Sequence, residues 1–266
     1  LCRFSDETEL SVSVVGGGPT GVELAGAIAE LKRGPLKSDN ELAAKRIHIR
    51  LVEAGPRLLP SFSEPLSART KKDLEKLGVE VLLNAGVKEV TADSMIFTDG
   101  QKVPSEITVW AAGVKGVPVL DELRIPMKDN RVEVNSSLQV KNHPSIFAIG
   151  DNAGAKAPDG RYFPMIAPVA MQQARFVATQ IEAASTGKAL SEFVYKDKGS
   201  MATIGRHKAI VQFKGIQIAG IPAWYAWLWL HLFYLLGGRN KIGTIADWTW
   251  NYLTFDRGNR HIMDSL

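Results

Sequence analysis

The stretch that most constrains the fold runs from residue 11 to residue 27, SVSVVGGGPTGVELAGA, where an apolar run ends in three glycines and passes into helix-forming residues. Gly16, Gly18 and Gly21 match the pattern G-x-G-x-x-G of a strand–turn–helix unit. In such a unit the glycines permit a tight turn, close approach to a pyrophosphate, and close packing of helix on strand. Pro19 suits the first turn of the helix, whose free N–H groups attract an anion. The stretch predicts a nucleotide site. Because the pattern alone is weak, a glycine-rich turn without a ligand is the alternative.

A second apolar run supports the nucleotide interpretation. It covers Ile47–Val52 and ends in Glu53, and an acidic side chain at the tip of the second strand can accept hydrogen bonds from an adenosine ribose. The polar insert at residues 33–46 explains an interval longer than the usual one of about 20 residues, as a long helix-to-strand connection. Glu53 would repel a 2′-phosphate, so the sequence favours NAD(H) over NADP(H), although the nearby Arg57 keeps that choice open.

The chain after Glu53 continues the alternation of helix and strand that a doubly wound α/β sheet requires. A helix is expected over residues 63–78 and a buried strand over 107–112. Between them Asp99-Gly100 marks a hairpin turn in a small antiparallel excursion. The other expected elements are strands over residues 79–83, 87–90, 94–97, 132–134, 138–140, 146–151 and 202–213, and a helix over 168–184.

The end of the chain is basic and rich in tryptophan. From Lys188 onward there are ten Lys and Arg against five Asp and Glu, and five of the six tryptophans. A helix over residues 222–236 would be about 22 Å long, shorter than the roughly 30 Å hydrocarbon core of a bilayer. A second aromatic segment follows at 242–255. Basic residues flank the two segments, at Arg239, Lys241, Arg257 and Arg260.

These features predict two short aromatic helices that dip into one leaflet of an anionic membrane. A buried core segment and a homodimer interface are the open alternatives. The aromatic residues cluster with Leu and Ile rather than with Arg and Lys, which argues against a nucleic-acid partner.

Several classes of site are excluded or disfavoured. The single cysteine, Cys2, excludes a disulfide framework, a C-x-x-C redox pair and a cysteine zinc cluster within this chain. No metal site is expected, and His231 is interpreted as a polar tip at an interface because no second ligand lies four residues on. The start, LCRFSDETEL, lacks both a signal peptide and an initiator Met, so we expect a fragment or a processed piece.

Seven motifs occur in order: VVGGGPTGVELAG, LVEAGPRLLPSF, TVWAAGV, FAIGD, APVAMQQAR, KGSMATIGRHKA and WNYLTFDRG. Over residues 10–260 the chain resembles the type II NADH:quinone oxidoreductases, the non-proton-pumping NADH dehydrogenases of the two-dinucleotide-binding flavoprotein superfamily. The resemblance implies a Rossmann-like NADH domain at 1–113, the C-terminal part of an FAD domain at 114–187, and a membrane-associating helical tail at 188–266. Members of that family begin with a separate FAD-binding unit. This sequence contains no such unit, so we expect the chain to bind FAD weakly or not at all by itself.

The resemblance also implies roles for single residues. NADH would be held by Gly16, Gly17, Gly18, Pro19, Thr20, Gly21, Glu53 and Gly113. FAD would be held by Gly150, Asp151, Ala167, Pro168 and Val169, with the helix that begins at Ala167–Pro168 directing its N-terminus at the flavin. Quinone would contact Gln172, Gln173 and Lys198, and Glu23 and Gln172 are the implied catalytic residues.

Some of these positions have structural alternatives. Glu23 could simply be a carboxylate favoured near a helix N-terminus. Asp151 could belong to a plain turn, and Lys198 could be solvated. Many relatives carry Gln where this chain has Pro168, so the residues of the quinone pocket are not settled by the resemblance.

The implied activity is hydride transfer from NADH to FAD, followed by transfer of two electrons to a membrane quinone without proton pumping. The implied place is the cytoplasmic face of the cell membrane, with peripheral attachment and anionic lipid as a partner. Two rivals remain at this stage. One is a pyridine nucleotide–disulfide reductase, and the other is a non-catalytic NAD(H)-binding membrane module.

Overall fold

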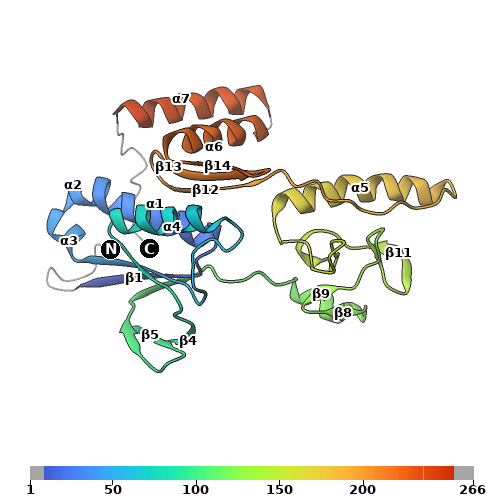
Figure 1. The fold of residues 1–266 in the computed structure, drawn as a ribbon, viewed down its shortest axis with the longest axis horizontal. Helices are drawn as coiled ribbons and strands as arrows, with labels where there is room; N and C mark the ends of the chain where they lie inside the picture. Colours follow the sequence, from blue (N-terminus) through green and yellow to red (C-terminus); the bar gives the residue numbers. More distant parts are fainter. Residues whose placement is uncertain (1–8, 236, 255–266) are drawn as a thin grey trace, which may run out of the picture. The chain divides into compact units, whose positions relative to one another are not determined.

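A computed structural model describes residues 9–235 and 237–254, so Cys2, Arg257 and Arg260 lie outside the described residues. The chain forms two compact units (Figure 1). Unit 1 combines the chain up to Ala112 with the chain from Gly199 onward, and unit 2 is Gly113–Lys198. This partition groups residues by packing, so the three-domain division made from the resemblance stays a prediction.

The centre of unit 1 is a four-stranded parallel sheet in the order β3-β2-β1-β7. Its strands are β1 (Leu10–Val15), β2 (Ile47–Val52), β3 (Val79–Leu82) and β7 (Ile107–Trp110). Val14 and Leu51 are fully buried, as expected where a parallel sheet is covered on both faces. Helices α1 (Pro19–Leu31) and α4 (Glu64–Lys76) provide the crossovers that parallel neighbours need. The predicted doubly wound α/β unit is confirmed.

The predicted antiparallel excursion is also confirmed. It consists of β4 (Val87–Val90), β5 (Ser94–Phe97) and β6 (Lys102–Pro104), paired in the order β4-β5-β6. Gly100, with a φ of +89°, closes the turn before β6. Met95 and Phe97 bury their side chains against Val15 and Val52 of the parallel sheet.

The connection between α1 and β2 is helical, which the polar composition of residues 33–46 did not indicate. A π-helical turn η1 (Lys32–Leu36) continues α1, and α2 (Lys37–Asp39) and α3 (Glu41–Lys45) follow. The Asn40 side chain starts α3 by accepting the Ala43 N–H at 2.9 Å.

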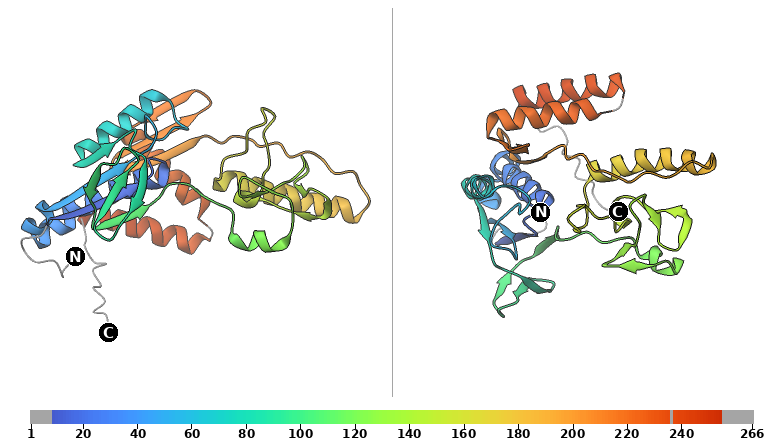
Figure 2. Two further views of the ribbon diagram at one scale, coloured as in Figure 1. Left: turned by 90° about the horizontal axis from the view of Figure 1, so that it is seen from below. Right: turned by 45° about the vertical axis from the view of Figure 1, so that its right-hand side comes forward.

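A second sheet in unit 1 comes from the far end of the chain. Its strands β12 (Ser200–Gly205), β13 (Lys208–Phe213) and β14 (Ile216–Ala219) are antiparallel. The sheet packs on α1, so this helix lies between two sheets (Figures 1 and 2). A Cβ on Gly26 would collide with the Ile204 carbonyl oxygen, which explains a glycine in the middle of the helix.

Two helices follow β14 and form the outer layers of unit 1. They are α6 (Ile221–Tyr234), which packs on β13, and α7 (Gly238–Thr254), which packs on α6. The two aromatic helices predicted from the sequence are thus present. Neither these nor the other described helices combine the length and apolarity needed to cross a bilayer.

Unit 2 is built from short elements around one long helix. Hairpins pair β8 (Met127–Lys128) with β9 (Arg131–Val132) and β10 (Gln139–Val140) with β11 (His143–Phe147). Two 3₁₀ turns are η2 (Pro118–Leu123) and η3 (Gly150–Asn152), and the helix is α5 (Ala167–Ser185). Leu138, Ala153, Ala155 and Val177 form its core.

One strand prediction in unit 2 is wrong. The apolar run at 146–151 was expected to be a strand ending in Gly-Asp, but the strand is β11, which ends at Phe147. Its position is fixed by the tight turn from β10, where Asn142 has a φ of +65°. Gly150, with a φ of +64°, leaves extended geometry and begins the 3₁₀ turn η3 instead.

Candidate functional site

The glycine-rich turn lies at the carboxyl end of β1, and its glycines meet different constraints. Gly16 has a φ of +113°, and a Cβ there would lie 2.8 Å from the Ala112 backbone nitrogen. A Cβ on Gly21 would overlap the Gly16 carbonyl oxygen. Gly18 differs, because its Cβ position has no atom within 4 Å. The turn is therefore closed on the protein side at Gly16 and Gly21 and open to an incoming group at Gly18.

Helix α1 starts directly from this turn with its N-terminus free of side-chain capping. Gly18 occupies the N-cap position, Pro19 follows, and no acidic residue lies in the first turn. The first N–H groups of a helix have no intrahelical acceptor, and the helix dipole gives this end a partial positive charge. Thr20 and Gly21 contribute such N–H groups, so the turn offers donors to an anion.

Glu53 lies beside the turn, as the sequence predicted, and is half-buried. One carboxylate oxygen, Oε2, accepts the Gly17 N–H at 2.6 Å, and the other, Oε1, accepts the Gly55 N–H at 2.7 Å. The carboxylate thus connects the glycine-rich turn to the loop after β2. Sequence reasoning gave Glu53 only a role toward a ribose and missed this structural one.

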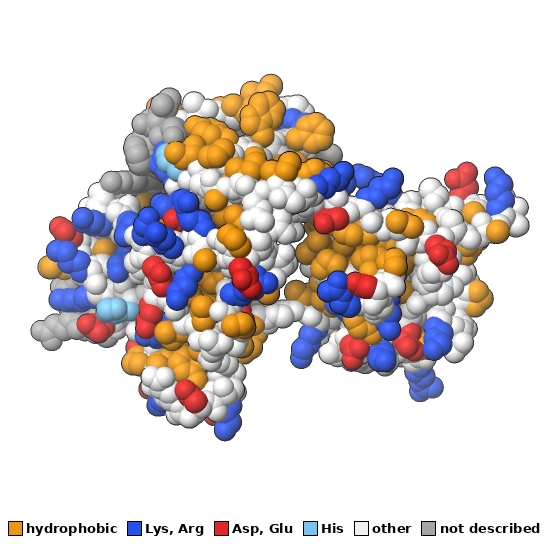
Figure 3. Space-filling model, in the orientation of Figure 1, with side chains coloured by type: hydrophobic (Ala, Val, Ile, Leu, Met, Phe, Trp, Pro, Cys, Tyr) orange, Lys and Arg blue, Asp and Glu red, His pale blue; other side chains and the backbone are white. Residues whose placement is uncertain are grey.

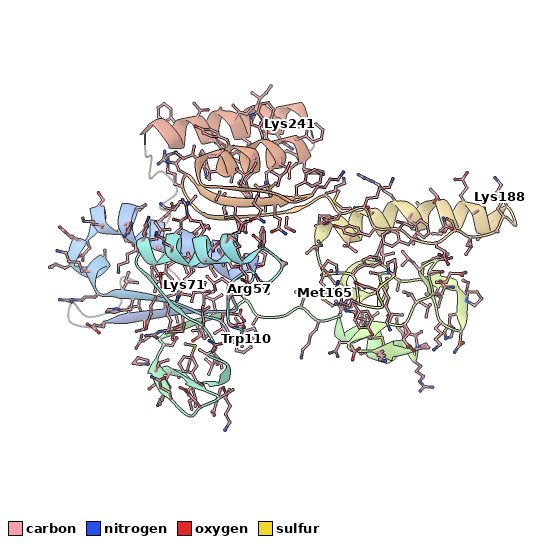
Figure 4. All side chains as sticks on the ribbon, in the orientation of Figure 1. Arg57, Lys71, Trp110, Met165, Lys188 and Lys241 are labelled. Atoms are coloured by element: carbon pink, nitrogen blue, oxygen red, sulfur yellow. The ribbon has the colours of Figure 1, made fainter. Side chains whose placement is uncertain are left out.

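Arg57, which left the choice of nucleotide open, lies in the loop after β2 and is labelled in Figure 4. Its guanidinium bonds to its own loop. Its Nη1 donates to the Phe62 carbonyl at 2.7 Å and its Nη2 to the Pro60 carbonyl at 2.9 Å. A longer bond of 3.3 Å joins Nη1 to Ser67 Oγ.

The edge of the turn opposite β2 is formed by the end of β7. Trp110 pairs in register with Val15 of β1, and its indole Nε1 donates to the Ala112 carbonyl at 2.8 Å. The ring of Trp110 remains 58% exposed. Gly113 follows with a φ of +80°, a conformation that favours glycine.

Glu23 lies further along α1 and is bonded to the C-terminal sheet. Its Oε1 accepts the Thr203 N–H of β12 at 3.1 Å. Glu23 also lines a cavity of about 640 Å³ that α1 and β12 share with the two aromatic helices, along with Trp224, Trp227 and Trp248. Sequence reasoning missed this juxtaposition, because 180 residues separate Glu23 from Thr203.

In unit 2 the residues expected to hold FAD gather at the start of α5 and at η3. Gln173 is buried, and its Oε1 accepts the Gly150 N–H at 2.6 Å. Asp151 follows and is half-buried. The N-terminus of α5 has Ile166 as N-cap without a capping side chain, Ala167 and Pro168 in its first turn, and Val169 buried.

Gln172 and Gln173 are adjacent in sequence but serve different backbone segments. Gln172 donates from Nε2 to the Lys196 carbonyl at 3.0 Å and accepts the Lys196 N–H at 3.0 Å. It therefore fastens the segment before Lys198 to α5, and Lys198 itself is exposed. In the same segment, burial and then the charge of Asp197 raise the pKa of Tyr195.

The described residues contain no group of three His, Cys, Asp or Glu arranged to hold a metal ion. His231 stacks on Trp227 with ring centroids 3.8 Å apart, and its Nδ1 lies 2.8 Å from the Trp227 carbonyl oxygen.

Comparisons with known proteins give consistent results. The family model described as pyridine nucleotide-disulphide oxidoreductase matches residues 3–174, and the NDH2 C-terminal domain matches residues 198–257. A type II NADH:quinone oxidoreductase of Mycobacterium tuberculosis is 36% identical over 96% of this chain and 57% of its own length. One from Haemophilus influenzae is 32% identical over 99% of this chain and 60% of its own. The chain thus spans little more than half the length of these relatives.

The solved structure of NDH2 from Plasmodium falciparum in complex with NADH has the same fold. It matches with a TM-score of 0.86 over 96% of this chain and 68% of that one, at 21% sequence identity.

Proposed function

We propose that this chain, which belongs to the pyridine nucleotide-disulphide oxidoreductase family, carries the NADH site of a type II NADH:quinone oxidoreductase. The observation that carries this proposal is the Glu53 carboxylate, 2.6 Å from the Gly17 amide and beside the uncapped N-terminus of α1. A carboxylate accepts hydrogen bonds from ribose hydroxyls, and the free N–H groups donate hydrogen bonds to a pyrophosphate. Together they supply the recognition chemistry of a dinucleotide.

The residues present fit NADH better than NADPH. Glu53 is acidic where a 2′-phosphate would add negative charge. The open space at Gly18 leaves room for the pyrophosphate to approach the backbone. Thr20 and Gly21 would donate to it from the first turn of α1, and Gly113 would leave room near the nicotinamide half.

The residues of unit 2 fit the ribityl and pyrimidine parts of FAD. The N-terminus of α5 has no capping side chain, and its partial positive charge would stabilise negative charge. Asp151 would accept a hydrogen bond from a ribityl hydroxyl, while Gln173 accepts the Gly150 N–H and so holds that turn in place. When bound, FAD supplies the hydride acceptor and the electron donor of the reaction, and the protein supplies position and electrostatics.

The proposed reaction passes hydride from NADH to FAD and two electrons on to a membrane quinone, without proton pumping. Glu23 and Gln172 are the proposed catalytic residues, and Gln172, Gln173 and Lys198 the proposed quinone contacts. Because both the Nε2 and the Oε1 of the Gln172 amide are bonded to the Lys196 backbone, we expect this side chain to keep one orientation.

We propose that α6 and α7 attach the protein peripherally to an anionic membrane, on the cytoplasmic face of the cell membrane. Apolar side chains gather over these helices on the face shown in Figure 3. Trp229 and Phe233 of α6 are each 72% exposed, and Ile242 of α7 is 71% exposed. Arg239 and Lys241 lie in the first turn of α7, where they would meet lipid phosphates.

NADH oxidation by the flavin-loaded protein, with a water-soluble quinone as acceptor, tests the catalytic proposal. Quinone reduction that depends on NADH and is much weaker with NADPH is the expected result. Reduction of a disulfide in place of the quinone would identify the rival reductase. NADH binding without flavin-dependent oxidation would favour the non-catalytic module.

Co-sedimentation with vesicles tests the membrane proposal. Trp229→Glu with Phe233→Glu should release the protein from vesicles containing anionic lipid, because it charges the most exposed aromatic positions. The control is Leu31→Glu with Leu42→Glu, which adds the same charge at exposed apolar sites elsewhere in unit 1. High salt should weaken binding only in part. If the α6 variant instead changes a dimer into a monomer, these helices form a homodimer interface.

A further inference from the structure

The loop between β2 and α4 folds back onto the glycine-rich turn. The Leu59 N–H donates to the Gly17 carbonyl at 2.8 Å. The buried Leu58 places its Cδ2 2.7 Å from the position that a Cβ on Gly17 would take. Three residues thus surround Gly17. Glu53 accepts from its N–H, Leu59 donates to its carbonyl, and Leu58 lies beside its Cα. Whatever fixes this loop therefore also fixes the second glycine of the turn.

The loop does not hold this shape through its own backbone preference. Leu59 has a φ of +49°, in the left-handed region that a Leu rarely occupies, and its side chain is fully buried. It also precedes Pro60, which restricts its backbone further. Such a conformation persists only where surrounding contacts impose it.

Leu59 is held directly by its N–H bond to Gly17 and by the Phe62 N–H, which donates to its carbonyl at 2.9 Å. Arg57 adds contacts to the residues that follow. Its two Nη groups donate to the carbonyls of Pro60 and Phe62, the residues that follow the strained Leu59. Through Ser67 it also reaches the first turns of α4. The planar guanidinium can serve separated acceptors at once, whereas a Lys ammonium is a single point charge.

We propose that Arg57 is a positioning residue of the nucleotide site, which holds Gly17 and Glu53 in the geometry that receives an adenosine ribose. It acts through the loop at residues 57–62 and does not touch the nucleotide. Because its guanidinium is committed to backbone carbonyls, it does not serve a 2′-phosphate. An arginine at this place in the sequence would otherwise indicate binding of NADPH. With its guanidinium bonded to the loop, Arg57 instead supports selectivity for NADH. The inference rests on the proposed nucleotide site.

Calorimetric titration of the full chain with ADP-ribose and with 2′-phospho-ADP-ribose tests the proposal. Arg57→Gln and Arg57→Lys should both weaken ADP-ribose binding roughly tenfold, the size expected for losing a charge-assisted hydrogen bond. The stoichiometry should stay that of wild type, because a merely structural defect would reduce the competent fraction instead. Neither variant should bind 2′-phospho-ADP-ribose more weakly relative to ADP-ribose than wild type does.

Arg50→Gln is the matched control. Arg50 lies on β2, a few residues before the loop. It bonds the Glu80 carboxylate and donates to the Pro104 carbonyl, and no bond of its side chain goes to the loop. Its loss should leave ADP-ribose affinity unchanged. Equal affinity in wild type and both Arg57 variants would overturn the proposal. So would selective loss of 2′-phospho-ADP-ribose binding in Arg57→Gln.

Hydrogen exchange without nucleotide separates this proposal from the proposed function. The Leu59 amide should exchange faster in both Arg57 variants than in wild type and Arg50→Gln, while the amides of β1 and β2 keep their protection. Unchanged Leu59 exchange would overturn the role of Arg57. Absence of ADP-ribose binding in wild type, with the exchange result as expected, would overturn the nucleotide site and leave Arg57 as the residue that holds the turn.

Discussion

Two glycine turns in this chain stand close to uncapped helix N-termini, and each has one amide held by a side chain at 2.6 Å. In unit 1 the Gly17 N–H is held by the Glu53 carboxylate, and in unit 2 the Gly150 N–H is held by the Gln173 amide. Glu53 comes from a neighbouring strand and is charged and half-buried. Gln173 comes from the adjacent helix α5 and is neutral and buried. The first turn thus depends on a charged group that follows a strand of the sheet, whereas the second depends on a neutral group of the helix that follows it.

Gly21→Ala should produce the largest effect on this comparison. Its new Cβ would meet the Gly16 carbonyl oxygen, which is backbone and cannot move aside cheaply. We expect a loss of about 3 kcal/mol or more in the free energy of unfolding, as for severe overpacking, and loss of NADH binding. Urea unfolding and NADH fluorescence titration measure the two effects.

Gly18→Ala is the control for that experiment. It adds the same methyl group one turn earlier, into open space and at an ordinary φ of −72°. Its stability should stay within about 0.5 kcal/mol of wild type, as for surface substitutions. Comparable destabilisation of both variants would show that the closed and open sides of the turn are assigned wrongly.

Glu53→Ala should have the next largest effect. It leaves the amides of Gly17 and Gly55 without their charged acceptor, which we expect to cost about 2 kcal/mol of stability. It should also weaken NADH binding and narrow the preference for NADH over NADPH, because the acceptor for the ribose hydroxyls is lost. Kinetics with both nucleotides, on the flavin-loaded protein, measure the preference.

Glu53→Gln separates the two roles of this side chain. It keeps one acceptor for the glycine-rich turn and removes the charge, so stability should recover more than nucleotide preference does. Wild-type protein that used both nucleotides equally would contradict the assignment of Glu53.

Gln173→Ala should lower the stability less than Gly21→Ala and Glu53→Ala do. It removes a neutral acceptor from the half-buried Gly150 N–H, which we expect to cost about 1.5 kcal/mol of stability. Gln180→Ala is the matched control, since Gln180 is also buried on α5 and accepts the Ser191 N–H at 2.8 Å. Both variants should lose stability, but only Gln173→Ala should weaken FAD binding in the flavin-loaded protein. Equal FAD affinities would show that the Gly150 turn does not position the flavin.

The parts of the fold that the sequence predicted are those with local signals. The Gly16–Gly21 turn and the Gly100 hairpin each have a glycine where a particular backbone geometry needs one. The strand expected at 146–151 failed because its apolar letters carry no information about register, which the hairpin from β10 sets. Helical periodicity likewise could not tell which of Gln172 and Gln173 points inward.

Part of the candidate site could likewise be predicted, because it too has local signals in the sequence. Glu53 could be placed beside the turn from the order of strands alone. Its bond to Gly17, and the engagement of Arg57 with Pro60 and Phe62, depend on how one loop folds back, for which the sequence has no separate signal. The sequence could mark Gly26 as a position where a helix presses on a sheet, and the structure confirms this. Its partner, Ile204 of β12, could not be predicted, because the two segments lie far apart in the chain.

The position of α1 between two sheets has a consequence for the order of synthesis. A ribosome completes α1 long before it reaches β12, and the Glu23–Thr203 bond spans 180 residues. Until β12 arrives, the face of α1 around Gly26 has no sheet to cover it, and contacts of such long range form slowly. A nascent chain that stalls before Gly199 would therefore expose apolar helix surface and be prone to aggregation, while its glycine-rich turn is already made.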